Sequence, residues 1–139
     1  MADPRKNPPT MIPYLTVRNA RKAIGFYEDA FGFKLLNSNE VDNGEEISHV
    51  EMQYKDVLIM FAPEGAFGCT TKAPVTLGTE PPINLYLYCD DVDILYKNAL
   101  KAGAISLIEP NDAFWGDRVC QLKDPDGFMW MFAKTLKKD

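Results

Sequence analysis

The only histidine of the chain and a glutamate two residues after it are the first candidates for chemistry. His49 and Glu51 lie in Glu46–Tyr54, where residues alternate as in a half-buried β-strand. Positions two apart in a strand point to the same face, so these side chains can meet as an acid/base pair. A solvated strand face explains the same residues, and the sequence leaves both readings open. Tyr14, in the first predicted strand, is a third acid/base candidate.

A second group of candidates lies near the C-terminus. Asp117 and Arg118 are neighbours in a predicted strand and therefore point to opposite faces of the sheet. One of them can then anchor the structure while the other reaches a ligand, although both can equally be surface charges. Trp115 precedes them on a predicted loop, where an aromatic ring can stack on a planar ligand or seal a dimer contact.

Composition excludes several classes of function. The chain has 139 residues and a net charge of −5, and that sign disfavours a nucleic-acid partner. It contains no run of 18 apolar residues, so we expect no membrane span, and the polar start favours a cytoplasmic location. One histidine per chain cannot form a three-histidine zinc site or an HExxH site. The cysteines match no disulfide or zinc spacing, and Cys89 and Cys120 are predicted to be buried and inert.

The two halves of the chain repeat one pattern of predicted elements. Each half reads strand, helix, glycine stop, strand, strand, turn and apolar strand. Gly32 and Gly103 are 71 residues apart, as are Met60 and Met131. In the first half the predicted elements are a strand at 11–17, a helix at 20–31 and strands at 33–41, 46–54 and 57–62. In the second half they are a strand at 83–89, a helix from Asp90 or Asp91 to about 102, a strand at 104–108, a turn at 109–112 and a strand–turn–strand from 114 to 133. We expect the last strand, Phe128–Ala133, to be buried on both faces.

This repeat predicts an α+β fold of two tandem βαβββ modules that form a curved mixed sheet around a cavity. A module of this kind cannot cover its sheet with one helix, so two modules can enclose a ligand between their sheets. We expect one domain at 11–134, with module one at 11–62, a linker at 63–82 and module two at 83–134. A disordered lead at 1–10 and a tail at 135–139 flank it.

Several short motifs resemble a known family. Pro13-Tyr14-Leu15, the Ala23–Phe33 segment and Cys89–Asp93 are similar to the strand and helix starts of the vicinal oxygen chelate superfamily, which includes glyoxalase I, extradiol dioxygenases and bleomycin resistance proteins. Phe114–Arg118, followed by Asp124–Gly127, resembles its PhnB-like and bleomycin-resistance-like subgroup. The resemblance implies the glyoxalase/bleomycin resistance fold and a homodimer.

The chain departs from that family at the positions of its metal ligands. Metal-dependent members hold the ion with His, Gln or Glu on the first and last strands of each module. Carried over by position, these ligands fall on Ile12, Met60, Asn84 and Met131. Aliphatic and thioether side chains are poor ligands for a hard or borderline divalent ion. We therefore expect no metal site and no cofactor.

A cavity floor without these ligands would be apolar and rich in methionine, which suits a small-molecule site. The preferred interpretation is a metal-independent small-molecule binding protein, not an enzyme, for a mostly apolar or planar ligand. The alternative is a glyoxalase-like lyase or isomerase that uses Glu51, His49 and Tyr14, or an atypical metal site. A scaffold with a filled cavity is a third possibility. The predicted ligand-binding residues are Tyr14, Met60, Asn84, Tyr86, Trp115, Arg118 and Met131.

Overall fold

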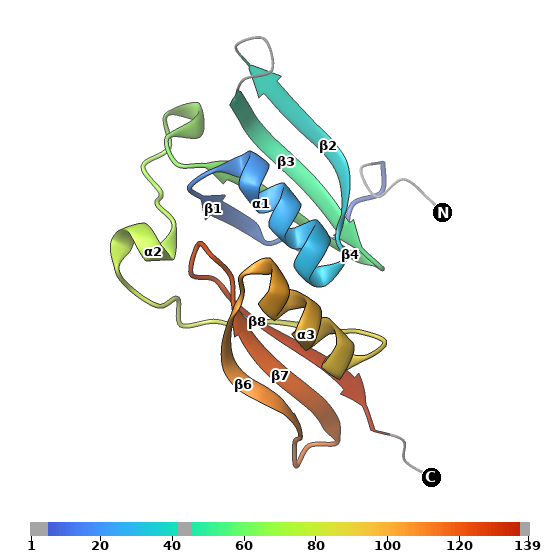
Figure 1. The fold of residues 1–139 in the computed structure, drawn as a ribbon. Coiled ribbons are helices and arrows are strands. Elements are labelled where there is room, and N and C mark those ends of the chain that lie inside the picture. Colours follow the sequence, from blue (N-terminus) through green and yellow to red (C-terminus); the bar gives the residue numbers. More distant parts are fainter. Residues whose placement is uncertain (1–5, 42–45, 137–139) are drawn as a thin grey trace. The chain divides into compact units, whose positions relative to one another are not determined.

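The computed structural model of the protein describes residues 6–41 and 46–136, so residues 1–5 of the predicted lead and 137–139 of the predicted tail lie outside it. The chain divides into two compact units. The first comprises Met1–Glu28 and Gly32–Ala73, and the second comprises Asp29–Phe31 and Pro74–Asp139. Each unit contains a four-stranded mixed sheet and one main helix (Figure 1).

The first unit has strand order β1-β4-β3-β2. The outer strand β1 runs parallel to β4, whereas the other neighbours are antiparallel. The ladder between β2 and β3 slips by one residue between His49 and Ile47, so strict alternation along β3 holds only from His49 onward. The strands are β1 (Tyr14–Val17), β2 (Lys34–Val41), β3 (Glu46–Tyr54) and β4 (Val57–Pro63).

The predicted first helix is confirmed, with one local change. Its start is capped by the Asn19 side chain, which accepts a hydrogen bond from the Lys22 amide at 2.9 Å. The α-helical part, α1 (Ala20–Phe26), continues into a π-helical segment, η1 (Tyr27–Phe31). Gly32, with φ of 81°, ends the helix in the left-handed conformation that favours glycine.

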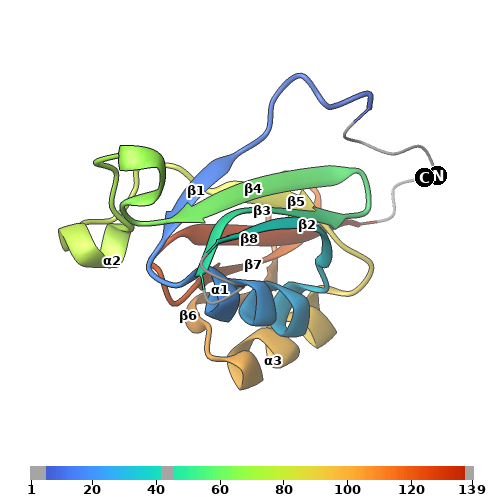
Figure 2. The same ribbon diagram turned by 90° about the horizontal axis from the view of Figure 1, so that it is seen from above.

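The second unit repeats this topology with strand order β5-β8-β7-β6, and β5 is parallel to β8. Its helix α3 (Val92–Ala102) is capped by Asp91 and ended by Gly103 with φ of 112°. The predicted α+β class and the tandem modules are therefore confirmed, as two four-stranded sheets. Figure 2 shows α1 on one side of the strands of its own sheet. The strands are β5 (Leu85–Tyr88), β6 (Ile105–Asp112), β7 (Asp117–Lys123) and β8 (Met129–Thr135).

The predicted turn at 109–112 is wrong, because β6 continues through it to Asp112. Pro110 is tolerated there for two reasons. The strand lies at the edge of its sheet, and its ladder with β7 shifts register between Ile108 and Asn111. The hairpin turn comes later, where Gly116 adopts φ of 99°. Trp115 is therefore a turn residue beside the start of β7.

The last strand is fully buried on one face only. Trp130 and Phe132 have no solvent exposure, and the Phe31 ring packs against theirs at centroid distances of 5.1 and 4.6 Å. Met129 and Met131, which alternate with them, are only half-buried. The expectation of burial on both faces is thus wrong for these two methionines. Their partial exposure leaves thioether surface on the second face of the sheet.

The turn before β8, at Asp124–Gly127, contacts the start of α2 (Pro74–Leu77) in the connecting segment, where the Val75 amide donates to the Asp126 carbonyl at 3.0 Å. The buried Asp124 carboxylate accepts hydrogen bonds from the amides of Asp126 and Phe128 and from the Trp130 indole, at 2.9–3.0 Å. Gly127 lies so close to the connecting segment that an added Cβ would meet the Pro74 Cβ at 2.9 Å. Within the predicted linker, 63–82, the structure forms η2 (Ala66–Gly68) and α2.

Candidate functional site

In each unit, most candidate residues lie on the sheet face that points away from the main helix, which we call the far face. Strand alternation and the ladder register define it. In the first sheet, Glu51 and Tyr14 both lie opposite Met60, while the neighbouring Val50 and Phe61 are fully buried. In the second sheet, Gln121 and Tyr86 both lie opposite Met131. The far faces carry Tyr14, Thr16, His49, Glu51 and Met60 in the first unit, and Tyr86, Tyr88, Asp117, Val119, Gln121 and Met131 in the second.

The far face of the first unit contains a chain of three titratable side chains. The Tyr14 hydroxyl lies 2.8 Å from Nδ1 of His49, and Nε2 of His49 lies 3.0 Å from Oε2 of Glu51. The carboxylate accepts from Nε2–H, and Nδ1 is then left to accept from the tyrosine hydroxyl. The structure thus brings together the three residues named as acid/base candidates.

Two properties of this chain bear on its chemistry. Oε1 of Glu51 is buried and, in the described part of the chain, has no hydrogen-bond partner. Such an atom is costly to bury, and a ligand donor that reached it would satisfy it. Burial raises the pKa of Tyr14, and the nearby Cys69 and Glu51 add to the effect. The phenol therefore stays protonated at neutral pH and serves as a donor.

The far face of the second unit carries a different polar cluster. Oδ2 of Asp117 accepts hydrogen bonds from the hydroxyls of Tyr86 at 2.6 Å and Tyr88 at 2.8 Å. The Trp115 indole donates to the Tyr86 hydroxyl at 3.0 Å. The hydrogen bond from Tyr86, followed by that from Tyr88, lowers the pKa of Asp117, so this carboxyl is ionised at neutral pH. Burial and the bond to Asp117 raise the pKa of Tyr86 to about 12.

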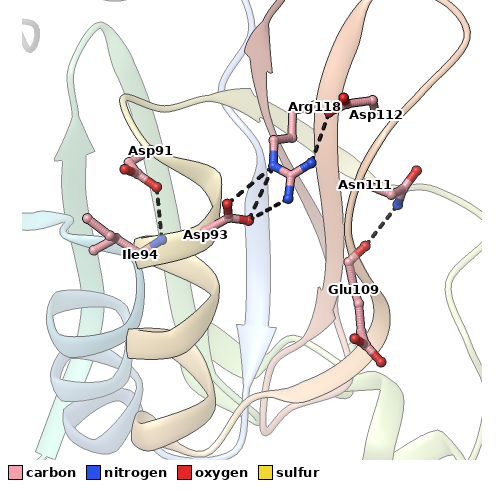
Figure 3. A network of polar contacts seen from close by, with 7 residues as sticks. All are labelled: Asp91, Asp93, Ile94, Glu109, Asn111, Asp112 and Arg118. Carbon is pink, nitrogen blue, oxygen red and sulfur yellow. Dashed lines mark hydrogen bonds and ion pairs between the residues drawn. The ribbon is translucent and has the colours of Figure 1, made fainter.

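Arg118 points to the other face of the same sheet (Figure 3). Its guanidinium pairs with Asp93 of α3 at 3.1 Å and with Asp112 of β6 at 2.9 Å. These bonds tie the helix to the edge of the sheet. Asp117 and Arg118 do point to opposite faces, as neighbours in a strand should, and the arginine has the anchoring position. A contact between Arg118 and a ligand stays a prediction.

The side chains at the family's metal positions do not fit a metal ion. Met60 and Met131 present half-buried thioethers, and Ile12 presents an aliphatic side chain. The Asn84 amide oxygen accepts from the Gln121 amide at 2.6 Å. Among residues 6–41 and 46–136, no group of three or more His, Cys, Asp or Glu side chains is placed to hold an ion.

A cavity of about 760 Å³ lies in the first unit, away from these clusters. Its lining mixes charges of both signs from the β1–α1 junction, the start of β3 and the segment after β4, including Arg18, Lys22, Glu46 and Glu64. None of the predicted ligand-binding residues lines it. No helix in the described ranges is long and apolar enough to cross a membrane.

Comparison with known proteins agrees with this architecture. The model of the Glyoxalase/Bleomycin resistance protein/Dioxygenase superfamily matches residues 9–132. The chain belongs to this superfamily. A Mycobacterium bovis protein of uncharacterised function is 30% identical over 132 residues, covering 94% of this chain and 86% of the relative. A bleomycin resistance protein of Geobacillus stearothermophilus is 27% identical, covering 91% and 96% of the two chains. The crystal structure of TioX from Micromonospora sp. ML1 shares the fold with a TM-score of 0.72 at 23% identity, covering 91% of this chain and 98% of that one.

The sequence predictions include the opposite orientations of Asp117 and Arg118 but neither the Asp117 cluster nor a role for Tyr88. The available signal was the spacing of Tyr86 and Tyr88, which places both rings on one face of a strand. Their meeting with Asp117 depends on the strand order, in which β8 lies between β5 and β7.

Proposed function

We propose that the protein binds a planar, mostly apolar small molecule on its far faces and does so without a metal. One observation carries the proposal. In both sheets the family's ligand position on the last strand is a half-buried methionine, with a tyrosine opposite it on the neighbouring parallel strand. These pairs are Tyr14 with Met60 and Tyr86 with Met131.

The chemistry of these pairs supports binding over metal-assisted catalysis. Methionine adapts to flat or irregular apolar surfaces, and tyrosine offers a ring with a polar end. Apolar surface with a few fixed polar groups is the usual lining of a small-molecule site. The likeness to bleomycin resistance proteins points the same way.

The test uses acridine, a planar heteroaromatic compound, in fluorescence titrations with the whole protein. We expect saturable binding, and about tenfold weaker binding in Met131→Ala or Met60→Ala, because each change removes apolar contact. Ile94→Ala is the matched control, since Ile94 is an exposed apolar side chain of α3. Absence of binding to acridine and to other planar aromatics would refute the proposal. Stoichiometric metal in purified protein would refute its metal-free part.

A specific observation favours a second candidate, acid/base catalysis by the first unit. The hydrogen-bonded series Tyr14, His49 and Glu51 has the form of a positioned donor, a relay and a carboxylate. Oε1 of Glu51 is the free acceptor of this series within the described structure. A lyase or isomerase needs such a group to take a proton from carbon.

This candidate is tested with dihydroxyacetone, a simple carbon acid. An active site of this kind removes the proton next to the carbonyl and returns a solvent proton, so deuterium from D₂O enters the substrate. We expect incorporation by the wild-type protein and at least about a hundredfold slower incorporation in Glu51→Gln, in line with loss of a general base. Gln121→Glu, at the equivalent position of the second unit, should match the wild type. Equal rates in wild type and Glu51→Gln would refute acid/base catalysis.

Three finer statements remain predictions of this proposal. We place the chain in the PhnB-like or bleomycin-resistance-like subgroup, we expect a homodimer, and we expect a cytoplasmic location. The exposed Phe114 supports a dimer contact, since aromatic side chains are common in interfaces. Light scattering on the purified protein gives its mass, and a monomer at micromolar concentration would contradict the dimer.

A further inference from the structure

We propose that Asp117 and the aromatic side chains around it, Tyr86, Tyr88 and Trp115, form a binding site for an organic cation on the far face of the second unit. The inference rests on the proposed function, because it specifies the charge of the ligand. The groups that it recognises are alkylated ammonium groups and cationic aromatic rings.

The first argument is the fixed negative charge. Asp117 is only 5% exposed, yet its carboxylate is held in the ionised form by the two tyrosine hydroxyls. A buried carboxylate is normally paired with a cation. Among the described residues, no Lys or Arg pairs with Asp117. Arg118, its neighbour in sequence, is turned to the other face and committed to Asp93 and Asp112. The charge is thus held in place without a counterion from this part of the chain.

The second argument is the aromatic surface beside that charge. Trp115 is 53% exposed, Tyr88 52% and Tyr86 39%, so their rings are accessible to a ligand. The rings of Tyr86 and Tyr88 lie 5.7 Å apart and meet edge to face at 70°. A cation is attracted to the face of such rings within about 6 Å of the centroid. The three aromatic side chains and the carboxylate therefore all attract a positively charged ligand.

The hydrogen bonds join these two effects. Both tyrosines donate their O–H protons to the same carboxylate oxygen, and the Tyr86 hydroxyl oxygen accepts a hydrogen bond from the indole N–H of Trp115. Donation to an anion polarises the phenol toward phenolate, and this makes its ring richer in electrons. With both hydroxyl protons engaged, a ligand finds few donors here for an anionic group. The arrangement therefore selects positive ligands over neutral or negative ones.

The experiment compares two ligands with the same three-ring frame, acridine and N-methylacridinium, at about pH 8, where acridine is neutral and Asp117 is ionised. Affinities are measured by fluorescence titration of the full chain. We expect the wild type to bind the cation about tenfold more tightly than acridine, and Asp117→Asn to reduce this ratio to about twofold. The asparagine retains an oxygen that accepts from both tyrosines. Glu109→Gln, which removes an exposed charge elsewhere on the same unit, should keep the tenfold ratio.

The outcomes separate this inference from the proposed function. Equal affinity for both ligands in the wild type would overturn the cation site and leave small-molecule binding intact. An unchanged ratio in Asp117→Asn would overturn the role of the carboxylate. Binding of neither ligand would overturn both proposals. The wild-type comparison needs no variant, so it decides the matter even if Asp117→Asn fails to fold.

Discussion

The far faces of the two units share one backbone plan and carry different chemistry. Tyr14 and Tyr86 occupy equivalent positions, each opposite a methionine of the last strand. The Tyr14 hydroxyl contacts His49, which continues to a carboxylate on the same strand. The Tyr86 hydroxyl donates to Asp117 at the start of its strand.

The difference follows from two positions of the middle strand. The register places Gln121 where the first unit has Glu51, and Val119 where it has His49. The second unit therefore cannot form the relay. Tyr86 instead donates to Asp117, which begins β7 directly after the hairpin turn. The far face of the first unit holds a series of groups able to pass a proton, whereas that of the second unit holds a fixed charge bonded to two tyrosine hydroxyls. A repeated fold thus keeps its registers while the sites built on it diverge.

The largest expected difference between the units lies in their second hairpin turns. Asp124→Ala removes the acceptor of three hydrogen bonds and leaves buried donors unpaired, so we expect a loss of about 3 kcal/mol in the free energy of unfolding. Asp56→Ala, in the corresponding exposed turn of the first unit, should change it by no more than about 0.5 kcal/mol. Urea denaturation measures both, and similar values would remove this contrast.

The next prediction concerns the alkaline titration of Tyr86, the tyrosine of the second unit. The pKa of Tyr86 in the folded protein, about 12, lies above the ordinary value of 10.0. The folded state therefore holds this proton more tightly, and the associated stability is present below pH 10 and is lost as the pH rises from about 10 to 12. Absorbance at about 295 nm reports phenolate, by its ordinary ultraviolet band. Comparison of the wild type with Tyr86→Phe should show that the lost phenol titrates near pH 12. A lost phenol that titrates near pH 10, the ordinary value, would contradict the cluster geometry.

A third experiment sharpens the difference in the middle strand. Because the chain has a single histidine, its ring nitrogens give unambiguous NMR signals. We expect neutral His49 to carry its proton on Nε2, directed at Glu51, and Glu51→Gln to convert this into a mixture of tautomers. Gln121→Glu, the reverse change at the equivalent position of the second unit, should leave the histidine spectrum unchanged. A predominant Nδ1–H form in the wild type would contradict the relay.

The smallest effect concerns the helix side of the second sheet. Arg118→Lys keeps the charge but loses the forked contact with Asp93 and Asp112, so stability should fall slightly. Because the guanidinium lies on the face opposite Asp117, affinity for N-methylacridinium should change by no more than about twofold. Titration of this variant beside Asp117→Asn gives the comparison. A larger loss in Arg118→Lys would place the ligand at the arginine.

Features set by short-range chemistry were predictable from the sequence. Gly32 and Gly103 end their helices in the left-handed conformation, and Asp91 caps the second helix, because backbone sterics and side-chain geometry determine these choices locally. The pairing of His49 with Glu51 follows from strand alternation in the same way. The π-helical segment Tyr27–Phe31 had no sequence signal that we recognised.

Features set by strand order could not be predicted in this way. The Asp117 cluster joins residues about thirty positions apart through an intervening strand, so it depends on tertiary structure. The continuation of β6 through Pro110 depends on its place at the sheet edge, where a missing N–H is tolerated. Local turn propensity favoured a turn there and was overridden by the ladder with β7.

The two indoles of the chain have a spectroscopic consequence. Trp130 is completely shielded and hydrogen-bonded to Asp124, whereas Trp115 is half exposed beside the proposed cation site. A neutral soluble quencher such as acrylamide should quench the exposed Trp115 first and leave a blue-shifted emission from the buried Trp130. Loss of the red component would then report occupancy of the far face, and loss of the blue component would report unfolding. The two tryptophans thus report ligand binding and unfolding separately.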